Sequence, residues 1–408
     1  MDQMLADQTV FTVFWGLVVV AVAALARFFR NQLLRLSKAA AKRLPEPLQS
    51  KIRRSADRRY PSWRAKAGES RTQSTLEWRI VKIREARQAN YHIVGAVYLD
   101  VFVRPVATRS LDDIEYSNLE EVRDDCGGSA CYVGRFLKSN FMKRSYLYTQ
   151  VGGSGPLTRL LKEHLAMEET WNRGGILKTD PTARSAVSVH MIQPHDEYHS
   201  TFTFKGALVS LSWDKVLPAL RKKSRRGGIL HISGYFRTGL DNGLTWSLHQ
   251  LPINLLTCID HGRFVPDDVN AASKSLLEAF SAKAIDIYIC TYPELRRLME
   301  QGDAMVADEM TIDVALKHFS SRGLLPRVAV VRCDPEPTLL RAFVLVDREV
   351  HVVERTTSSD ATQFRIGVSN AFNASLLYHL SVGDPAEDFH TSVCEAVGDA
   401  LDTLRRNL

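Results

Sequence analysis

Short apolar runs alternate with stretches of helical periodicity from His92 to the end of the chain. The runs are bounded by glycine, proline and polar residues, which is typical of buried β-strands. They cover residues 93–100, 228–235, 253–260, 285–290, 328–333, 342–346 and 349–353. Strands that alternate with helices in this way predict an α/β domain with a mainly parallel central sheet.

A different apolar pattern opens the chain. Residues 8–26 carry no charge and are long enough for a transmembrane helix, which needs about 17–25 residues. The small residues at positions 24 and 26 are also typical of a signal-peptide cleavage site, but no basic residue precedes the apolar run. We therefore predict an uncleaved single-pass anchor over residues 1–30, with the globular domain on the cytosolic side of a membrane.

The positive net charge of +7 belongs mainly to the segment that follows this anchor. Between Arg27 and Lys66 there are thirteen lysines and arginines against Glu46 and Asp57. We expect residues 31–89 to form a basic juxtamembrane helix and linker that lies on anionic headgroups, and residues 90–408 to form the domain. Because the rest of the chain is slightly acidic, the charge does not indicate nucleic-acid binding.

The six cysteines contain no Cys-x-x-Cys pair, and we expect free thiols in a reducing compartment. The histidines at positions 190, 195 and 199 lie close together in the sequence, but two strand-like segments and a turn account for them, so no metal site is predicted. The glycine-rich segment 150–157 lacks the Gly-Lys-Ser/Thr ending of a phosphate loop.

The stretch 365–380 combines small residues with a strongly apolar helical pattern. Gly367 and Ser369 allow a tight turn, and Asn370 stands where we expect a helix N-cap. The start of a helix gathers unpaired N–H groups and the positive end of the dipole, so it can bind an anion such as phosphate. The simpler interpretation is a capped helix that packs one face into a core.

Four further features accompany this stretch. A predicted strand ends on Asp100, the paired glycines Gly127 and Gly128 precede a helical segment, and two further strands run into Asp260 and into Thr291-Tyr-Pro-Glu294. In this order, and over about residues 90–405, the features resemble the PfkB/ribokinase family of carbohydrate and nucleoside kinases. The resemblance implies a ribokinase-like three-layer α/β/α sandwich with a small β-lid, which segments 101–106 and 186–204 would form. It also implies ATP and Mg²⁺ as cofactors, a sugar or nucleoside as substrate, and a homodimer that pairs through the lid.

The resemblance assigns a role to each of these positions. Asp100 matches the aspartate that binds sugar hydroxyls, while Gly127 and Gly128 match the paired glycine that admits substrate close to the backbone. Asp260 matches the start of an Asp-x-Asn-x-Arg motif at the substrate site. Glu294 matches the acid of an Asn-x-x-Glu motif that is tied to Mg²⁺ and phosphate.

The catalytic signature itself departs from the family pattern. Gly367, Val368 and Ser369 align with the anion hole, although the family has alanine and glycine at the last two positions. Phe364 replaces the first aspartate of the signature, and Asn370 replaces the catalytic aspartate that acts as general base. A carboxamide cannot take up the hydroxyl proton, and general-base catalysis is typically worth about 10²–10⁴ in rate.

Two further departures concern the substrate and phosphate positions. Tyr132 stands where the family has an asparagine four residues after the second glycine, and Thr291 replaces the asparagine of Asn-x-x-Glu. We therefore predict a membrane-anchored PfkB-like domain with impaired catalysis, which acts as a nucleotide, sugar or nucleoside sensor or as an interaction module. The alternatives are an active divergent kinase whose base is Asp260 or Glu294, and a scaffold without a ligand.

Overall fold

The structure is a computed structural model, and the residues it describes all belong to one compact unit, Glu69–Leu408. The described residues are 76–86, 89–105, 119–167, 170–172, 176–192, 199–262, 269–301, 311–333, 339–356 and 368–407. The predicted anchor, the basic helix and most of the predicted linker lie outside these ranges. Within the described ranges, no helix has both the length and the apolar character that a membrane span requires.

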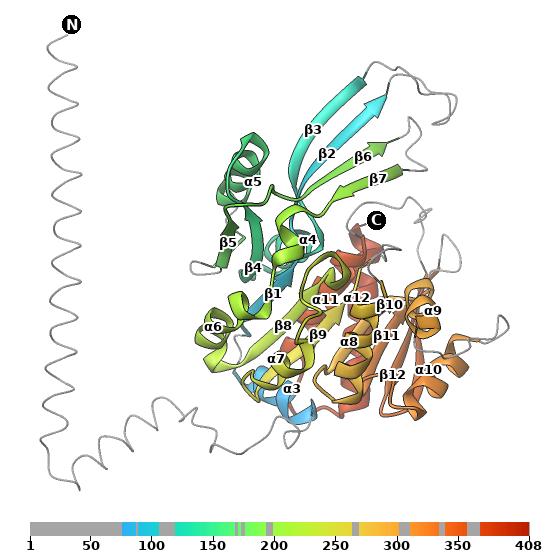
Figure 1. Cartoon of the computed structure of the whole chain (residues 1–408). Helices are drawn as coiled ribbons and strands as arrows, with labels where there is room; N and C mark the ends of the chain where they lie inside the picture. Colours follow the sequence, from blue (N-terminus) through green and yellow to red (C-terminus); the bar gives the residue numbers. More distant parts are fainter. Residues whose placement is uncertain are drawn as a thin grey trace, which may run out of the picture. The chain divides into compact units, whose positions relative to one another are not determined.

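A nine-stranded sheet forms the centre of this unit (Figure 1). Its strands, in spatial order, are β13 (Glu349–Thr356), β12 (Leu339–Val346), β11 (Val328–Arg332), β10 (Ile287–Thr291), β9 (Leu255–Asp260), β8 (Gly228–Ser233), β1 (Tyr91–Gly95), β4 (Ser145–Gly152) and β5 (Ile176–Asp180). Every neighbouring pair from β11 to β5 is parallel, and only β12 and β13 run antiparallel to their neighbours. The prediction of a mainly parallel sheet is confirmed.

Helices cover both faces of the sheet. One hydrophobic cluster contains side chains of α3 (Leu76–Glu85), α4 (Ser129–Phe141), α5 (Pro156–Met167), α11 (Val368–Val382) and α12 (Phe389–Asn407). The other contains side chains of α6 (Trp213–Lys223), α7 (Leu244–His249), α8 (Val269–Ser281), α9 (Tyr292–Gln301) and α10 (Ile312–Ser321). The three-layer arrangement expected from the resemblance is confirmed, and α3, which precedes residue 90, packs into the first cluster.

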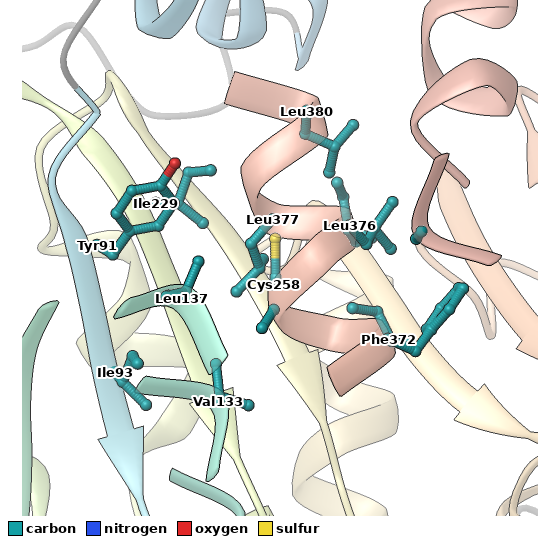
Figure 2. Packing of buried hydrophobic residues seen from close by; sticks show 14 of the residues in the cluster. Tyr91, Ile93, Val133, Leu137, Ile229, Cys258, Phe372, Leu376, Leu377 and Leu380 are labelled. Carbon is teal, nitrogen blue, oxygen red and sulfur yellow. The ribbon is translucent and has the colours of Figure 1, made fainter. Parts of the chain in front are cut away.

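The central strands are buried along their whole length because both of their faces are covered. Every residue of β1, β8 and β11 is buried. In Figure 2, Leu377 of α11 lies beside Cys258 of β9, and Phe372 and Leu376 belong to the same hydrophobic cluster. Each fully buried Leu, Ile or Phe side chain contributes about 1.5–3 kcal/mol to folding. This packing fixes α11 against the sheet.

The second sheet contains four strands in the order β3 (Leu119–Gly127), β2 (Tyr98–Pro105), β6 (Val187–Ile192) and β7 (His199–Phe204). It includes both segments that were expected to form the β-lid. One expectation was wrong, because residues 93–100 do not form a single strand. The chain leaves the main sheet after Gly95 and enters the lid at Tyr98, so Asp100 lies in a lid strand.

The cysteines are free thiols in the structure, as their spacing suggested. Four of them are buried, and two of these, Cys126 at the end of β3 and Cys131 in α4, have Sγ atoms 3.0 Å apart. They pack in the same hydrophobic cluster as α11 and therefore behave as small apolar side chains.

Two histidines lie in the interior of the main sheet. His92 in β1 and His231 in β8 are fully buried, and burial lowers the pKa of each to about 3. His92 Nδ1 lies 3.0 Å from the hydroxyl of Tyr148, whereas His231 Nε2 is 3.8 Å from the carboxylate of Asp260. Both imidazoles are therefore neutral in the folded protein at any pH near neutrality.

We predict that the free energy of unfolding of the full-length chain falls as the pH is lowered from 6.5 towards 3. The unfolded chain takes up a proton on each histidine near pH 6.5, whereas the folded chain takes it up only near pH 3, so stability present above pH 6.5 is lost below it. The slope reaches up to about 1.4 kcal/mol per pH unit for each histidine. Urea denaturation between pH 5 and 7 measures it.

The variant His231→Met removes one of these groups and should give a shallower slope than wild type. The control is His318→Gln, which changes an exposed histidine on α10 and should leave the slope unchanged. Equal slopes in all three proteins would contradict the assignment.

Candidate functional site

The carboxyl ends of five neighbouring parallel strands lie side by side at one edge of the main sheet. They end on Gly95, Ser233, Asp260, Thr291 and Arg332, and the first three are directly paired in register. The order of the strands reverses at β1, because β4 and β5 extend from one side of it and β8 to β11 from the other. In open α/β sheets, ligands bind outside the carboxyl ends of the strands at such a reversal.

Asp260 is the centre of the polar contacts at this edge. Its carboxylate accepts hydrogen bonds from Ser233 Oγ at 3.1 Å, from the Gly262 backbone N–H at 2.7 Å and from Asn373 Nδ2 at 3.0 Å. Ser233 ends β8, and Asn373 lies in the buried face of α11. The carboxylate therefore connects two strands with the helix that carries the predicted catalytic stretch.

Burial, together with the negative charge of Glu294, raises the pKa of Asp260 to about 7. The hydrogen bonds from Gly262 and Ser233 act in the opposite direction, because they favour the ionised form. A carboxyl group with this pKa exchanges a proton near neutral pH, which is the property that a general acid or base needs.

The start of α11 differs from the prediction. The helix begins at Val368, two residues before Asn370, so Asn370 is a half-buried residue of the first turn and not the N-cap. Gly367, the first residue of the predicted anion hole, lies outside the described residues. The hydroxyl of Ser369 is exposed towards the sheet edge, and it accepts a hydrogen bond from Arg332 Nη2 at 3.0 Å.

Arg332 places a positive charge beside the first turn of α11. It is the last residue of β11, and only 8% of its surface is exposed. A guanidinium at this place adds to the positive end of the helix dipole, and both favour an anion.

Glu294 has a local structural contact in addition to its place near Asp260. Its Oε2 accepts a hydrogen bond from the Thr291 backbone N–H at 2.8 Å, and α9 begins at Tyr292. This is one half of a capping box, in which the third helical residue reaches back to the residue before the helix. The Thr-x-x-Glu spacing therefore stabilises the start of α9, whether or not a cation binds.

The second group of predicted residues gathers around Asp100, whose side chain is 2% exposed. The hydroxyl of Tyr132 donates a hydrogen bond to Asp100 Oδ2 at 2.7 Å, and His190 Nε2 lies 3.4 Å from the same oxygen. A Cβ on Gly127 would lie 1.7 Å from this oxygen, so the glycine makes room for the carboxylate. Burial and the Asp100 charge raise the pKa of the Tyr132 hydroxyl, which therefore remains a donor.

The paired glycines bring the two groups close together. Gly128 is the N-cap of α4, with a φ of 88° that a side chain rarely tolerates. The next residue, Ser129, approaches Gly234, where a Cβ would lie 2.3 Å from Ser129 Oγ. A Cβ on Gly262 would in turn lie 3.2 Å from Gly234 Cα, so the start of α4 adjoins the loop that donates to Asp260.

No protein-family model matches the sequence, and no curated protein matches it either. Solved structures do match. A ribokinase from Thermotoga maritima is 14% identical with a TM-score of 0.53, over 76% of this chain and 91% of that one. Phosphofructokinase-2 from Escherichia coli is 16% identical with a TM-score of 0.54, over 76% and 92%. A nucleoside kinase from Burkholderia thailandensis is 15% identical with a TM-score of 0.52, over 76% and 90%.

The chain has the ribokinase fold. The resemblance that the motifs indicated is thereby confirmed at the level of the fold. At sequence identities of 14–16%, these structural matches establish the fold alone. The chemistry of the site therefore has to be argued from the residues of this chain.

Sequence reasoning missed three residues of this ribokinase-like edge. Asn373 is a polar residue in an otherwise apolar helical run, and Arg332 is a charge that ends an apolar strand. Both patterns could have indicated a polar contact, since a polar group is rarely buried without a hydrogen-bond partner. His190 was considered only as a metal ligand, and its proximity to Asp100 results from the pairing of β2 with β6. His195 lies outside the described residues.

We predict that Asp260 lowers the stability of the folded chain as the pH rises from 6 to 8. The folded protein holds the Asp260 proton up to about pH 7, whereas the unfolded chain has already lost it above pH 3.8, so the stabilising contribution is lost through pH 7. His92 and His231 act in the opposite direction below about pH 6.5, so the test compares the variant with wild type. From pH 6 to 8, Asp260→Asn should gain more stability than wild type, by up to about 1.4 kcal/mol. Chemical denaturation at pH 6 and 8 measures it.

The control is Asp313→Asn, which removes a surface carboxylate of α10 paired with Lys317. It should retain the wild-type difference between the two pH values. A wild-type difference that Asp260→Asn leaves unchanged would exclude Asp260 as its source.

Proposed function

We propose that this chain is a membrane-anchored ribokinase-like domain that binds a nucleotide, nucleoside or sugar and has lost most or all phosphoryl transfer. The main observation behind this proposal is that the Asp100 carboxylate already contacts two side chains of the same chain. It accepts a hydrogen bond from Tyr132, and His190 lies beside it. The resemblance assigns the binding of sugar hydroxyls to this carboxylate. A substrate that uses it must first displace a buried tyrosine hydroxyl, so an enzyme would bind substrate at a cost.

The first turn of α11 supports the same conclusion. Asn370 stands in place of the base, and a carboxamide has no proton affinity near neutral pH. Positioning and electrostatic stabilisation account for much of phosphoryl-transfer catalysis, so the loss of a base lowers the rate without removing the anion site. The backbone N–H groups of the first turn and the guanidinium of Arg332 remain as donors to a phosphate.

The described residues fit a phosphate better than Mg²⁺. ATP would supply the phosphoryl group, and Arg332 with the first turn of α11 would hold its phosphates. A magnesium ion needs ionised carboxylates, but Asp260 is only partly ionised at pH 7 and Glu294 accepts a hydrogen bond from Thr291. Binding of a nucleotide with little dependence on Mg²⁺ follows from this arrangement.

The known ligands of proteins with this fold suggest which molecules to test. The Burkholderia nucleoside kinase was solved with inosine, and the Escherichia coli phosphofructokinase-2 with its substrates and products. We extend the nucleoside class to the present chain as a candidate ligand, together with the sugars and nucleotides that the resemblance implies.

Residues 1–30 would anchor the domain to a membrane with the domain on the cytosolic side, and the lid would pair two copies. The uncharged apolar segment 8–26 supports the anchor.

Exposed apolar side chains on two lid strands support the pairing of two copies. They are Val122 of β3 with Phe202 and Phe204 of β7.

A second function is favoured by one observation. Because the pKa of Asp260 is raised to about 7, this residue has the proton affinity of a general base at the edge where the resemblance places the substrate. An active but divergent sugar or nucleoside kinase would use Asp260 in place of the missing aspartate. The two functions differ in whether the wild-type chain turns over ATP.

We predict no efficient ADP formation by the full-length wild-type chain with Mg²⁺-ATP and a panel of sugars and nucleosides. Asn370→Asp restores the base, and Tyr132→Asn restores the family residue and releases Asp100. The double variant should turn over at least about 10²-fold faster than wild type, because a restored general base is worth about 10²–10⁴. A coupled ADP assay measures all four proteins.

Efficient turnover by wild type would show that the proposal is wrong and that the chain is an enzyme. If none of the four proteins turns over, the shift of the melting temperature with ATP, ADP, inosine or sugars decides the remaining question. A shift supports the sensor, since a ligand that binds only the folded state stabilises it. No shift with any compound would favour a scaffold without a ligand.

If wild type is active, we predict that Asp260→Asn lowers kcat by about 10²–10⁴. Glu294→Gln should then have a smaller effect, because its amide oxygen still accepts from the Thr291 N–H. The pH dependence of kcat should rise through pH 7 in wild type. An Asp260→Asn variant with unchanged kcat would exclude this residue as the base.

A further inference from the structure

A cluster of histidines and carboxylates lies on the edge strand of the main sheet, separated from β9 by β12, β11 and β10. Asp347 and Arg348 form the two-residue turn between β12 and β13, with φ values of 47° and 78°. Glu349 and His351 follow on β13. Since alternate residues of a strand share one face, both side chains lie on the same side of the sheet.

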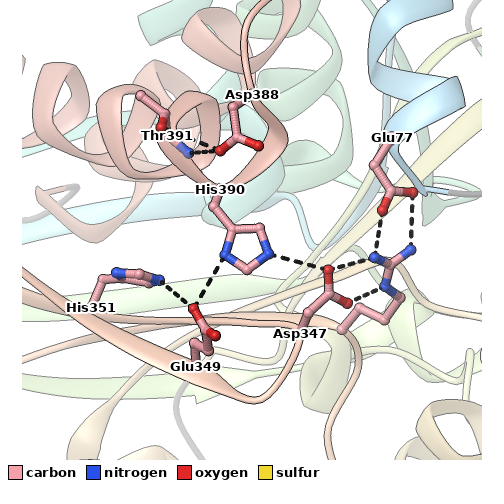
Figure 3. Close-up of polar contacts among 8 residues, drawn as sticks. Glu77, Asp347, Glu349, His351, Asp388, His390 and Thr391 are labelled. Atoms are coloured by element: carbon pink, nitrogen blue, oxygen red, sulfur yellow. Dashed lines mark hydrogen bonds and ion pairs between the residues drawn. The ribbon is translucent and has the colours of Figure 1, made fainter.

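The first turn of α12 completes the cluster. Asp388 precedes the helix, and its carboxylate accepts hydrogen bonds from the backbone N–H of Thr391 at 3.1 Å and from its hydroxyl at 3.3 Å. These bonds fix the start of the helix and hence His390, its second residue. Figure 3 shows the imidazole of His390 between Glu349 and Asp347.

Three donor atoms converge at this place. One ligand atom from each of Glu349, His351 and His390 lies within 4.8 Å of the other two. Glu349 Oε2 is 3.8 Å from His390 Nδ1 and 3.9 Å from His351 Nε2. These distances exceed hydrogen-bond length, so the groups face one another across a gap.

We propose that Glu349, His351 and His390 bind a divalent transition-metal ion of the zinc class. Two imidazole nitrogens and one carboxylate oxygen form a donor set that zinc sites use, with a fourth position for water. Zinc lies about 2.0–2.2 Å from such donors, so tetrahedral ligands are about 3.3 Å apart. Small side-chain rotations would close the present gaps to that spacing.

His351 provides an independent sign of a ligand. Its Nε2 is buried and has no hydrogen-bond partner within the described part of the chain, although Glu349 lies opposite. A buried nitrogen without a hydrogen-bond partner loses its solvation without compensation. A cation bound between this nitrogen and Glu349 would give the nitrogen a partner.

The surroundings of His390 match the outer shell of metal sites. Its other ring nitrogen, Nε2, lies 3.5 Å from Asp347 Oδ2. Arg327 holds Asp347 with two hydrogen bonds of 2.5 Å, and the same guanidinium binds Glu77 of α3 (Figure 3). Metal-bound histidines usually donate their second N–H to a carboxylate, which fixes the ring and strengthens the metal bond.

The site is also open to solvent and to exchange of its fourth ligand. Both histidines line a surface hollow of about 460 Å³, together with Thr391 and Cys394. Glu349 is 71% exposed, so its carboxylate can turn towards an ion. A bound ion would join the edge strand β13 to the first turn of α12.

The test uses the full-length chain, stripped of metal with EDTA and then titrated with ZnCl₂ alone. Equilibrium dialysis with elemental analysis counts bound zinc, and Co²⁺ replaces it as a spectroscopic probe of coordination. The variants are Glu349→Gln, His351→Gln, His390→Gln and Asp347→Asn. The matched control is His164→Gln, since His164 is a surface histidine paired with Asp124 at 2.6 Å outside the cluster.

Wild type and His164→Gln should bind one equivalent of zinc that each of the three ligand variants loses. Each ligand variant should weaken this binding at least about 100-fold, and Asp347→Asn about 10–100-fold. Zinc should raise the melting temperature of wild type and the control, and not of the ligand variants. Circular dichroism and the metal-free melting temperature confirm that each variant is folded.

The proposal is overturned if wild type binds no more zinc than the three ligand variants, or if His164→Gln loses the same equivalent. Neither outcome bears on ATP turnover, so the metal site and the proposed function can fail separately.

Discussion

The coverage of the main sheet on both faces is the constraint on which the rest of the structure depends. Because helices cover both faces, the central strands β1, β8 and β11 are buried at every position. The two imidazoles inside these strands are held neutral by burial, and the charged side chains lie at the strand ends. Ser233, Asp260 and Arg332 are the last residues of their strands, so the same constraint that builds the core collects the reactive groups at one edge.

The helix α11 shows how packing and chemistry depend on each other there. Phe372, Leu376 and Leu377 fix the helix in the core, and Asn373 on the same buried face holds the Asp260 carboxylate. Under the proposed function, this packing would keep the anion-binding geometry while phosphoryl transfer is lost. A site of this kind is suited to recognition, because the geometry that binds an anion depends on backbone and core, and catalysis depends on one carboxylate.

Much of the fold could be predicted from the sequence, because continuous apolar runs identify buried strands. The prediction of a single strand over residues 93–100 was wrong for the same reason. The apolar run continues where the chain passes from one sheet, at Gly95, to the other, at Tyr98. The prediction of Asn370 as the helix N-cap was wrong because α11 begins earlier, at Val368. The contacts of Asn373 and Tyr132 with their aspartates join residues distant in sequence, which no local pattern contains.

The close approach of Gly127 to Asp100 changes how a paired glycine is interpreted. In a kinase such a glycine makes room for a molecule from solution, whereas here the space is filled by the chain's own carboxylate. Packing against this carboxylate alone would favour the glycine, whether or not a ligand binds. The glycine pair of this chain is therefore explained by its packing, and the contact of Tyr132 with Asp100 occupies the carboxylate that the glycine accommodates.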